Sequence, residues 1–124
     1  MKIMIVDDSS VMRKIVTRTI RQTGFEIEEI VEASDGLDAL EKLKSYTSDL
    51  ILCDVNMPNM NGLEFVEKVN AEKIAPESDI IMVTTEGGID IVNKAVENGA
   101  KGFIIKPFTP EDFVAKVKHL CKRW

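Results

Sequence analysis

The stretch DLILCD, residues 49–54, joins an uninterrupted apolar run to an acidic residue, and it indicates the class of the fold. Runs of the same kind occur at Ile3 to Val6 and at Ile80 to Val83. A strand that is apolar on both faces is typical of a parallel sheet covered by helices on each side, whereas a half-exposed antiparallel strand alternates apolar and polar residues. The three runs therefore predict buried strands in a parallel sheet.

Segments with helical periodicity alternate with the strand-like segments along the chain. In the first of them the apolar positions are Val11, Ile15, Val16 and Ile20, which share one face of a helix. Five strands are predicted, at Lys2 to Val6, roughly Glu26 to Glu32, Asp49 to Cys53, Asp79 to Thr84 and Gly102 to Ile105. The sequence thus predicts five βα units in a single doubly wound α/β domain that spans residues 1–124.

Residues typical of helix ends support this division. Ser10 is expected to cap the first helix, and Thr109 is expected to cap the last, with Pro110 at its first position. Gly24 and Gly99 stand where the ends of two helices require a positive φ. The predicted elements are therefore short and closely spaced, with no linker between them.

Length and charge exclude several classes of protein. A chain of 124 residues is expected to form one domain without a linked output module. Its 16 Lys and Arg against 21 Asp and Glu give a net charge of −5, which opposes binding to nucleic acid or to an anionic membrane. The longest apolar runs fall well short of the roughly 20 residues of a membrane span, and we expect no secretory signal. We expect a cytoplasmic monomer in which Cys53 and Cys121 are unpaired core residues.

Polar residues follow four of the predicted strands. Asp7 and Asp8 follow the first strand, Asp54 the third, Thr84 ends the fourth and Lys106 follows the fifth. Doubly wound folds bind ligands at the carboxyl ends of their strands. If the first and third strands are neighbours, the three carboxylates converge within about 5 Å, and each pair repels by roughly 3 kcal/mol at an effective dielectric of 20.

Such a carboxylate cluster requires a cation. Oxygen ligands suit Mg²⁺, and Lys106 and the Thr84 hydroxyl add a fixed positive charge and a neutral donor. This combination is typical of phosphoryl transfer. Each residue alone has an ordinary explanation, as a helix-dipole acid, a solvated loop residue or a strand threonine. Four loops that carry compatible groups at one edge favour a shared site.

Four motifs together resemble the receiver domain of two-component response regulators. They are Asp7-Asp8, the run DVNMPNMNG at residues 54–62, Thr84-Thr85-Glu86 and Lys106-Pro107-Phe108. The resemblance covers the whole chain and is strongest to the single-domain chemotaxis members, the CheY-like proteins. It implies a flavodoxin-like sheet with strand order 2-1-3-4-5 and five helices, and a cis peptide between Lys106 and Pro107.

The resemblance also implies roles for the site residues. Asp54 would accept a phosphoryl group from a kinase phosphohistidine. Asp8 and Asp54 would bind Mg²⁺ directly, Asp7 would hold it mainly through water, and the main-chain carbonyl of Asn56 would complete the protein ligands. Lys106 would pair with the phosphoryl oxygens. The resemblance therefore makes Asp54 and Lys106 the central pair of the reaction.

A conformational switch is implied by the same resemblance. The hydroxyl of Thr84 would move onto the phosphoryl group, and Phe103 would turn inward into the vacated space. CheY-like proteins commonly carry Tyr at the position of Phe103, so this chain keeps the ring without a hydroxyl; a plain packing role for the ring is the alternative. Asn56 and Glu86 would flank the acyl phosphate and shorten its lifetime, although both also fit solvated polar side chains.

The resemblance predicts a signalling switch that catalyses only its own phosphorylation and dephosphorylation, and therefore no enzyme with a separate substrate. A sensor histidine kinase would be the phosphodonor, and a protein such as the flagellar motor switch would be the output target. Three alternatives stay open. The first is a phosphorelay intermediate that passes its phosphoryl group to a histidine phosphotransfer protein. The second is a Mg²⁺-dependent aspartyl-phosphate hydrolase, and the third is a flavin binder, which Asp7 and Asp8 disfavour by repelling a phosphate.

Overall fold

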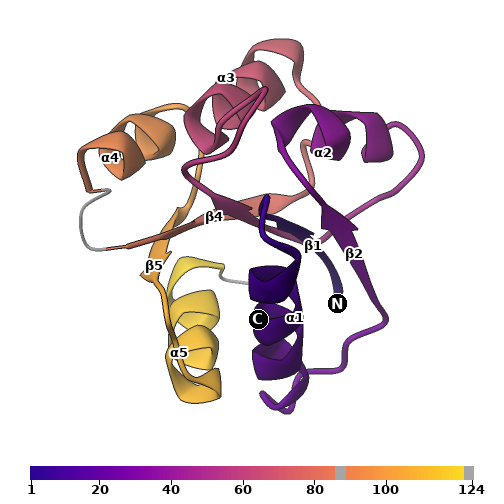
Figure 1. Ribbon diagram of the computed structural model, residues 1–124, viewed down its shortest axis with the longest axis vertical. Helices are drawn as coiled ribbons and strands as arrows, with labels where there is room; N and C mark the ends of the chain where they lie inside the picture. Colours follow the sequence, from indigo (N-terminus) through magenta and orange to yellow (C-terminus); the bar gives the residue numbers. More distant parts are fainter. Residues whose placement is uncertain (86–88, 122–124) are drawn as a thin grey trace.

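The computed structural model describes residues 1–85 and 89–121, in which five strands and five helices alternate (Figure 1). The elements are β1 (Lys2–Val6), α1 (Ser10–Arg21), β2 (Glu29–Ala33), α2 (Gly36–Lys42), β3 (Leu50–Asp54), α3 (Gly62–Glu72), β4 (Asp79–Thr84), α4 (Ile89–Glu97), β5 (Gly102–Ile105) and α5 (Pro110–Leu120). None of the helices in the described ranges has the length and apolar content that a membrane span requires. The predicted doubly wound α/β class is confirmed.

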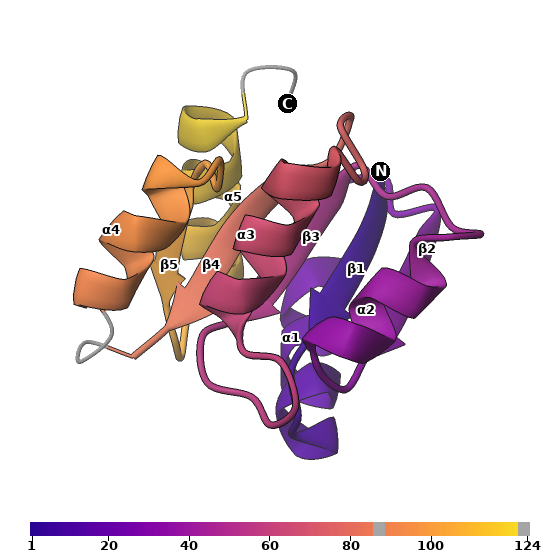
Figure 2. The same cartoon turned by 90° about the horizontal axis from the view of Figure 1, so that it is seen from above.

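The sheet is parallel throughout and has the order β2-β1-β3-β4-β5, as predicted. Helices α2, α3 and α4 cover one face, and α1 and α5 cover the other (Figures 1 and 2). Val6 pairs with Cys53, Asp54 with Val83, and Thr84 with Ile105. Because all strands run in one direction, the carboxyl ends of β1, β3, β4 and β5 meet at one edge of the sheet.

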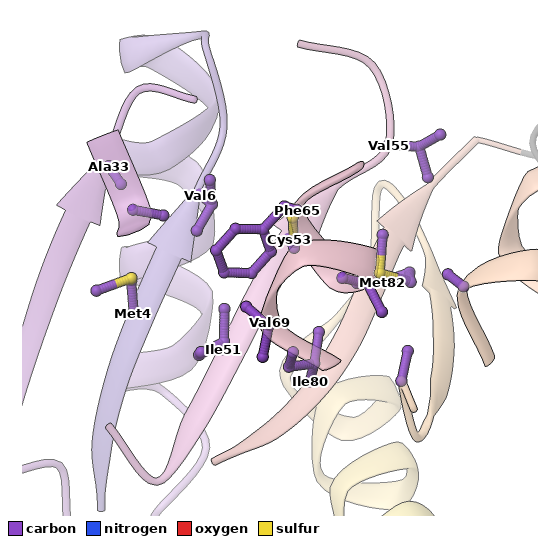
Figure 3. Packing of buried hydrophobic residues seen from close by; sticks show 14 of the residues in the cluster. Met4, Val6, Ala33, Ile51, Cys53, Val55, Phe65, Val69, Ile80 and Met82 are labelled. Carbon is purple, nitrogen blue, oxygen red and sulfur yellow. The ribbon is translucent and has the colours of Figure 1, made fainter. Parts of the chain in front are cut away.

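The central strand β3 is buried along its full length. Its side chains alternate between two cores, with Ile51 and Cys53 facing the cluster under α2, α3 and α4, and Leu52 facing the cluster under α1 and α5. Phe65 of α3 lies over Val6 and Cys53 (Figure 3) and is fully buried. Burial of one such side chain contributes about 1.5–3 kcal/mol, so β3 is a rigid support for the acidic residue at its end.

Two strand boundaries differ from the prediction. Strand β2 begins at Glu29 and extends to Ala33, because pairing with β1 starts at Lys2 and Glu29. The residues just before Glu29 lie outside this pairing, and the amide of Glu28 donates to the carbonyl of Met1 at 2.9 Å. Strand β3 is shifted by one residue and includes Asp54, which pairs with Val83 of β4. The acid at this position therefore belongs to the strand itself.

Helix α1 also departs from the prediction in two respects. Its N-cap is Ser9 instead of Ser10, and the Ser9 hydroxyl accepts a hydrogen bond from the amide of Met12 at 3.1 Å. The cap falls one residue earlier because the Asp7 carboxylate binds the Ser9 amide and ends the loop there. Val11 and Ile15 are 66% and 47% exposed, so the buried face is narrower than the apolar pattern indicated.

The remaining predicted helix ends are confirmed. Thr109 caps α5 in a reciprocal arrangement with Asp112, whose amide and carboxylate each form a 3.1 Å hydrogen bond with Thr109. Pro110 is the first residue of the helix. Gly24 and Gly99 have φ values of 85° and 113°, in the left-handed region. Cys53 and Cys121 are buried and form no disulfide bond with each other, as predicted.

Candidate functional site

Three carboxylates converge at the carboxyl edge of the sheet. Asp7, Asp8 and Asp54 each offer an oxygen, and these atoms lie within 4.8 Å of one another. The predicted convergence is thus confirmed, and its cause is the adjacency of β1 and β3. Asp7 and Asp54 are buried, whereas Asp8 is exposed. The cluster therefore has two covered acids and one that faces solvent.

Hydrogen bonds fix the carboxylate of Asp54. Its Oδ1 accepts from the main-chain amide of Val55 at 2.8 Å and from Nζ of Lys106 at 3.2 Å. The same ammonium lies 3.8 Å from Oδ2 of Asp7. The Lys106 side chain is 16% exposed, which makes these contacts stronger than those of a surface pair. Lys106 thus neutralises part of the negative charge of Asp54.

The loop after β5 directs Lys106 across the end of the sheet. The amide of Lys106 donates to the carbonyl of Thr84 at 2.8 Å, which ties the loop to the end of β4. The peptide between Lys106 and Pro107 is cis, as predicted. The lysine therefore reaches Asp54 from the far side of β4.

The environment of Asp7 indicates a shortage of positive charge. Burial raises the pKa of this carboxyl, and the charges of Asp54 and Asp8 add to that effect. The Ser9 amide, 2.8 Å from Oδ1, and the ammonium of Lys106 act in the opposite direction and only partly offset it. Three carboxylates against one lysine therefore leave a deficit that a divalent cation would fill.

The donor set fits Mg²⁺. Carboxylate oxygens are the ligands that hard divalent cations prefer, and an exposed member such as Asp8 leaves room for the waters that Mg²⁺ retains. Asn56, whose carbonyl was predicted as a further ligand, is exposed in the loop that follows β3. Asp7, Asp8 and Asp54 would hold the ion beside the Asp54 oxygens.

The two predicted switch residues lie in neighbouring strands. Thr84 is buried at the end of β4, and its hydroxyl donates to the carbonyl of Thr85 at 3.0 Å. Phe103 of β5 is half-buried against the core under α4 and lines a hollow of about 440 Å³ beside α5. The ammonium of Lys116 lies 4.9 Å from its ring centroid. Glu86, the remaining predicted residue, lies outside the described residues.

Four further residues support the site without having been predicted. Arg13 donates from Nη1 to the main-chain carbonyl of Asp7 at 2.6 Å and from Nε to Glu32 at 2.9 Å. Asn59, in the loop after β3, donates from its side chain to Asp35 at 2.8 Å. Arg13 and Glu32 are 19 residues apart in sequence, and Asn59 and Asp35 are 24 apart. The sequence around these residues does not indicate either contact, because the partners come together only when the strands assemble into the sheet.

Comparison with characterised proteins is consistent with this arrangement. The chain is 43% identical to chemotaxis protein CheY1 of Helicobacter pylori over 119 residues, which cover 95% of this chain and 94% of that protein. It is 44% identical over 119 residues to the chemotaxis protein CheY homolog of Campylobacter jejuni, covering 95% and 90% of the two chains. The likeness therefore extends over nearly the full length of both relatives.

Solved structures and a family model agree with these relatives. The structure of the chemotaxis response regulator CheY4 of Vibrio cholerae superposes with a TM-score of 0.79 at 36% identity, covering 96% of this chain and 97% of that one. The family model described as the response regulator receiver domain matches residues 3–118. That range contains the acidic cluster, Lys106, and the strand order that brings them together. The chain belongs to the response regulator receiver domain family.

Proposed function

We propose that this protein is a single-domain response regulator that is phosphorylated on Asp54 in a Mg²⁺-dependent reaction. One observation carries the proposal: the Asp54 carboxylate lies within 4.8 Å of Asp7 and Asp8 and 3.2 Å from the ammonium of Lys106. A carboxylate oxygen, two further acidic side chains and a fixed positive charge at one point support this proposal. The chain covers 94% and 90% of two chemotaxis relatives, which supports a function like theirs.

The chemistry is transfer of a phosphoryl group from a phosphohistidine to an aspartate. A carboxylate oxygen of Asp54 forms a bond to phosphorus while the bond between phosphorus and the histidine nitrogen breaks, and that nitrogen takes a proton from solvent. The Val55 amide and Lys106 hold the carboxylate in one orientation. Bound Mg²⁺ would supply charge neutralisation for the transferred group. Lys106 would then pair with the phosphoryl oxygens, and the Thr84 hydroxyl would donate to one of them.

The protein acts through other proteins in this proposal. A sensor histidine kinase supplies the phosphoryl group, and the names of the relatives support chemotaxis, with the flagellar motor switch as the leading output target. The net charge of −5 disfavours nucleic acid and anionic membrane as partners. The protein would act in the cytoplasm and catalyse only its own phosphorylation and dephosphorylation.

Labelling with a small phosphodonor tests the proposal. In the presence of Mg²⁺ the wild-type protein should gain one phosphoryl group, and peptide mapping should place it on Asp54. Asp54→Asn should not be labelled at that position. Asp90→Asn, which changes an exposed acid in α4, is the matched control and should be labelled like wild type. A label that maps to any other residue of the wild-type protein contradicts the proposal.

A further inference from the structure

Arg13 of α1 connects the acidic cluster to the edge strand β2. Its Nη1 donates to the main-chain carbonyl of Asp7 at 2.6 Å, and its Nε donates to the carboxylate of Glu32 at 2.9 Å. The side chain is only 16% exposed. A largely covered guanidinium with two acceptors is held in one plane and one direction. Arg13 is therefore a fixed brace between α1, β2 and the end of β1.

Arg13 binds the peptide that joins two acids of the cluster. The carbonyl that Arg13 binds belongs to the peptide bond between Asp7 and Asp8. The amide of Asp7 donates to the carbonyl of Ala33 at 3.0 Å, and its carboxylate accepts from the Ser9 amide at 2.8 Å. With the carbonyl also bound, the peptide plane before Asp8 has a defined orientation. The direction in which Asp8 leaves the strand depends on that plane.

Glu32 is itself held on the other side by α2. Its main-chain carbonyl accepts from the ammonium of Lys42, which lies 3.2 Å from the carboxylate of Asp38. Strand β2 is an edge strand with exposed residues along its length. Lys42 therefore anchors the main chain of β2 at Glu32, and the carboxylate of the same residue accepts from Arg13.

We infer that Arg13 is a positioning residue for metal binding at Asp7, Asp8 and Asp54. It holds the peptide between Asp7 and Asp8 so that the carboxylates converge, and Glu32 keeps it in that orientation. The inference rests on the proposed function, because it requires that this cluster bind Mg²⁺. Groups that orient metal ligands typically change metal affinity about 10- to 100-fold when removed.

Considered by charge alone, removal of Arg13 should have the opposite effect on Mg²⁺ affinity. A guanidinium near three carboxylates repels an incoming divalent cation, so its removal should strengthen Mg²⁺ binding if electrostatics dominates. Loss of positioning should weaken the binding instead. The sign of the change in Mg²⁺ affinity therefore separates the two effects without reference to its size.

Titration of the full chain with Mg²⁺ by calorimetry measures that sign. Arg13→Gln should bind Mg²⁺ about tenfold more weakly than wild type. Arg13→Lys keeps the charge, but its ammonium lacks the planar fork that binds both acceptors. It should therefore also bind Mg²⁺ more weakly than wild type, with a smaller loss of affinity than Arg13→Gln. Arg18→Gln is the matched control, since it removes an exposed guanidinium from the same helix, and it should bind like wild type.

A second measurement separates positioning from general stability. Phosphorylation of Asp54 by a small phosphodonor should be slow in Arg13→Gln at limiting Mg²⁺ and should return close to the wild-type rate at saturating Mg²⁺. A role confined to fold stability would lower the melting temperature and leave the Mg²⁺ affinity unchanged. Arg13→Lys leaves the charge unchanged and serves if Arg13→Gln does not fold; because charge then has no effect, any weakening of Mg²⁺ binding reports positioning.

The outcomes distinguish this inference from the proposed function. Mg²⁺ affinity that is unchanged or stronger in both Arg13→Gln and Arg13→Lys overturns the positioning role, while labelling of wild-type Asp54 leaves the proposed function intact. A wild-type protein that neither binds Mg²⁺ nor is labelled on Asp54 overturns both.

Discussion

Asp8 is the exposed member of a cluster in which three carboxylates face one lysine. Removal of Asp8 takes away a ligand and also relieves repulsion, so its two effects have opposite signs. We expect Asp8→Ala to weaken Mg²⁺ binding strongly. The free energy of unfolding without Mg²⁺ should be unchanged or higher, by at most about 1 kcal/mol because Asp8 is exposed. Calorimetric titration and urea unfolding measure the two effects.

Lys106→Met should change stability in the opposite direction to Asp8→Ala. It leaves the buried acids Asp7 and Asp54 without their ammonium, so the free energy of unfolding without Mg²⁺ should fall by about 3 kcal/mol or more. Saturating Mg²⁺ should recover part of this loss, because ligand binding to the folded state stabilises it. Equal Mg²⁺ affinities for wild type and Asp8→Ala would remove the cluster as the metal site.

Gly62 begins α3 at a point where the backbone passes very close to the end of β3, which carries Asp54. A Cβ at this position would lie 2.2 Å from the main-chain carbonyl oxygen of Asp54 and 3.0 Å from Cα of Val55. Because these atoms are backbone, they cannot move without displacing the end of β3. Gly62→Ala should therefore lower the free energy of unfolding by about 1–3 kcal/mol and also weaken Mg²⁺ binding.

Gly24→Ala is the control for that substitution. Gly24 has a φ of 85°, and a Cβ at this position would have no heavy atom within 4 Å, so only backbone strain opposes the change. It should cost about 1–2 kcal/mol in urea unfolding without altering Mg²⁺ affinity. An Mg²⁺ affinity of Gly62→Ala equal to that of Gly24→Ala would show that β3 tolerates the displacement.

Helix α2 and the loop after β3 are joined through one carboxylate. Asp35 caps α2 by accepting from the amide of Asp38 at 2.8 Å, and it accepts from the side chain of Asn59 at 2.8 Å. The Asn59 amide, and then the Asp38 amide, lower the pKa of Asp35. A lowered pKa in the folded state gives stability that is present above the unfolded pKa of 3.8 and is lost as pH falls through the folded pKa.

This linkage predicts a difference between two substitutions of Asp35. Asp35→Asn retains a capping side chain but does not titrate, so the loss of stability below about pH 5 should be shallower than in wild type. Asp35→Ala should cost about 1 kcal/mol already at neutral pH, because the cap is lost. Urea unfolding over a pH series measures both. If Asp35→Asn loses stability at low pH as steeply as wild type does, other carboxyl groups account for that loss.

The sheet links Asp54 of β3 to the edge strand β5 through β4. Asp54 pairs with Val83, and Phe103 of β5 pairs with Met82 of the same β4 strand. A change at Thr84 can therefore reach Phe103 through one strand. Moving the Phe103 side chain from 1:99 to 99:1 in favour of its inward rotamer requires about 5.5 kcal/mol of differential stabilisation. We therefore expect a partial shift.

Amide exchange with and without a stable phosphoryl mimic tests this connection. Protection should change in residues 89–108 as well as in the loops around Asp54. Phe103→Ala should be phosphorylated normally but should show a smaller difference in partner binding between the two forms. If the protection changes stay within the loops around Asp54, the proposed route through β4 and β5 is wrong.

The architecture of this protein could be predicted from local features of its chain. Apolar runs such as Ile80 to Val83 marked buried parallel strands, and the Thr109 and Pro110 pair marked the start of α5. These signals depend on neighbouring residues alone, since hydrophobic periodicity and helix capping are properties of short segments. The position of acids after strands also placed a candidate site at the carboxyl edge. The strand order itself came from family resemblance.

Contacts between distant elements required the assembled sheet. The bonds from Arg13 to Asp7 and Glu32, and from Asn59 to Asp35, depend on which strands are adjacent and in what register. Packing also left the apolar Ile15 of α1 exposed, although its spacing matched a buried face. Strand adjacency and register arise from the packing of all layers together, and short-range sequence patterns do not encode them. The parts of the site that hold its acids in place therefore became visible only in three dimensions.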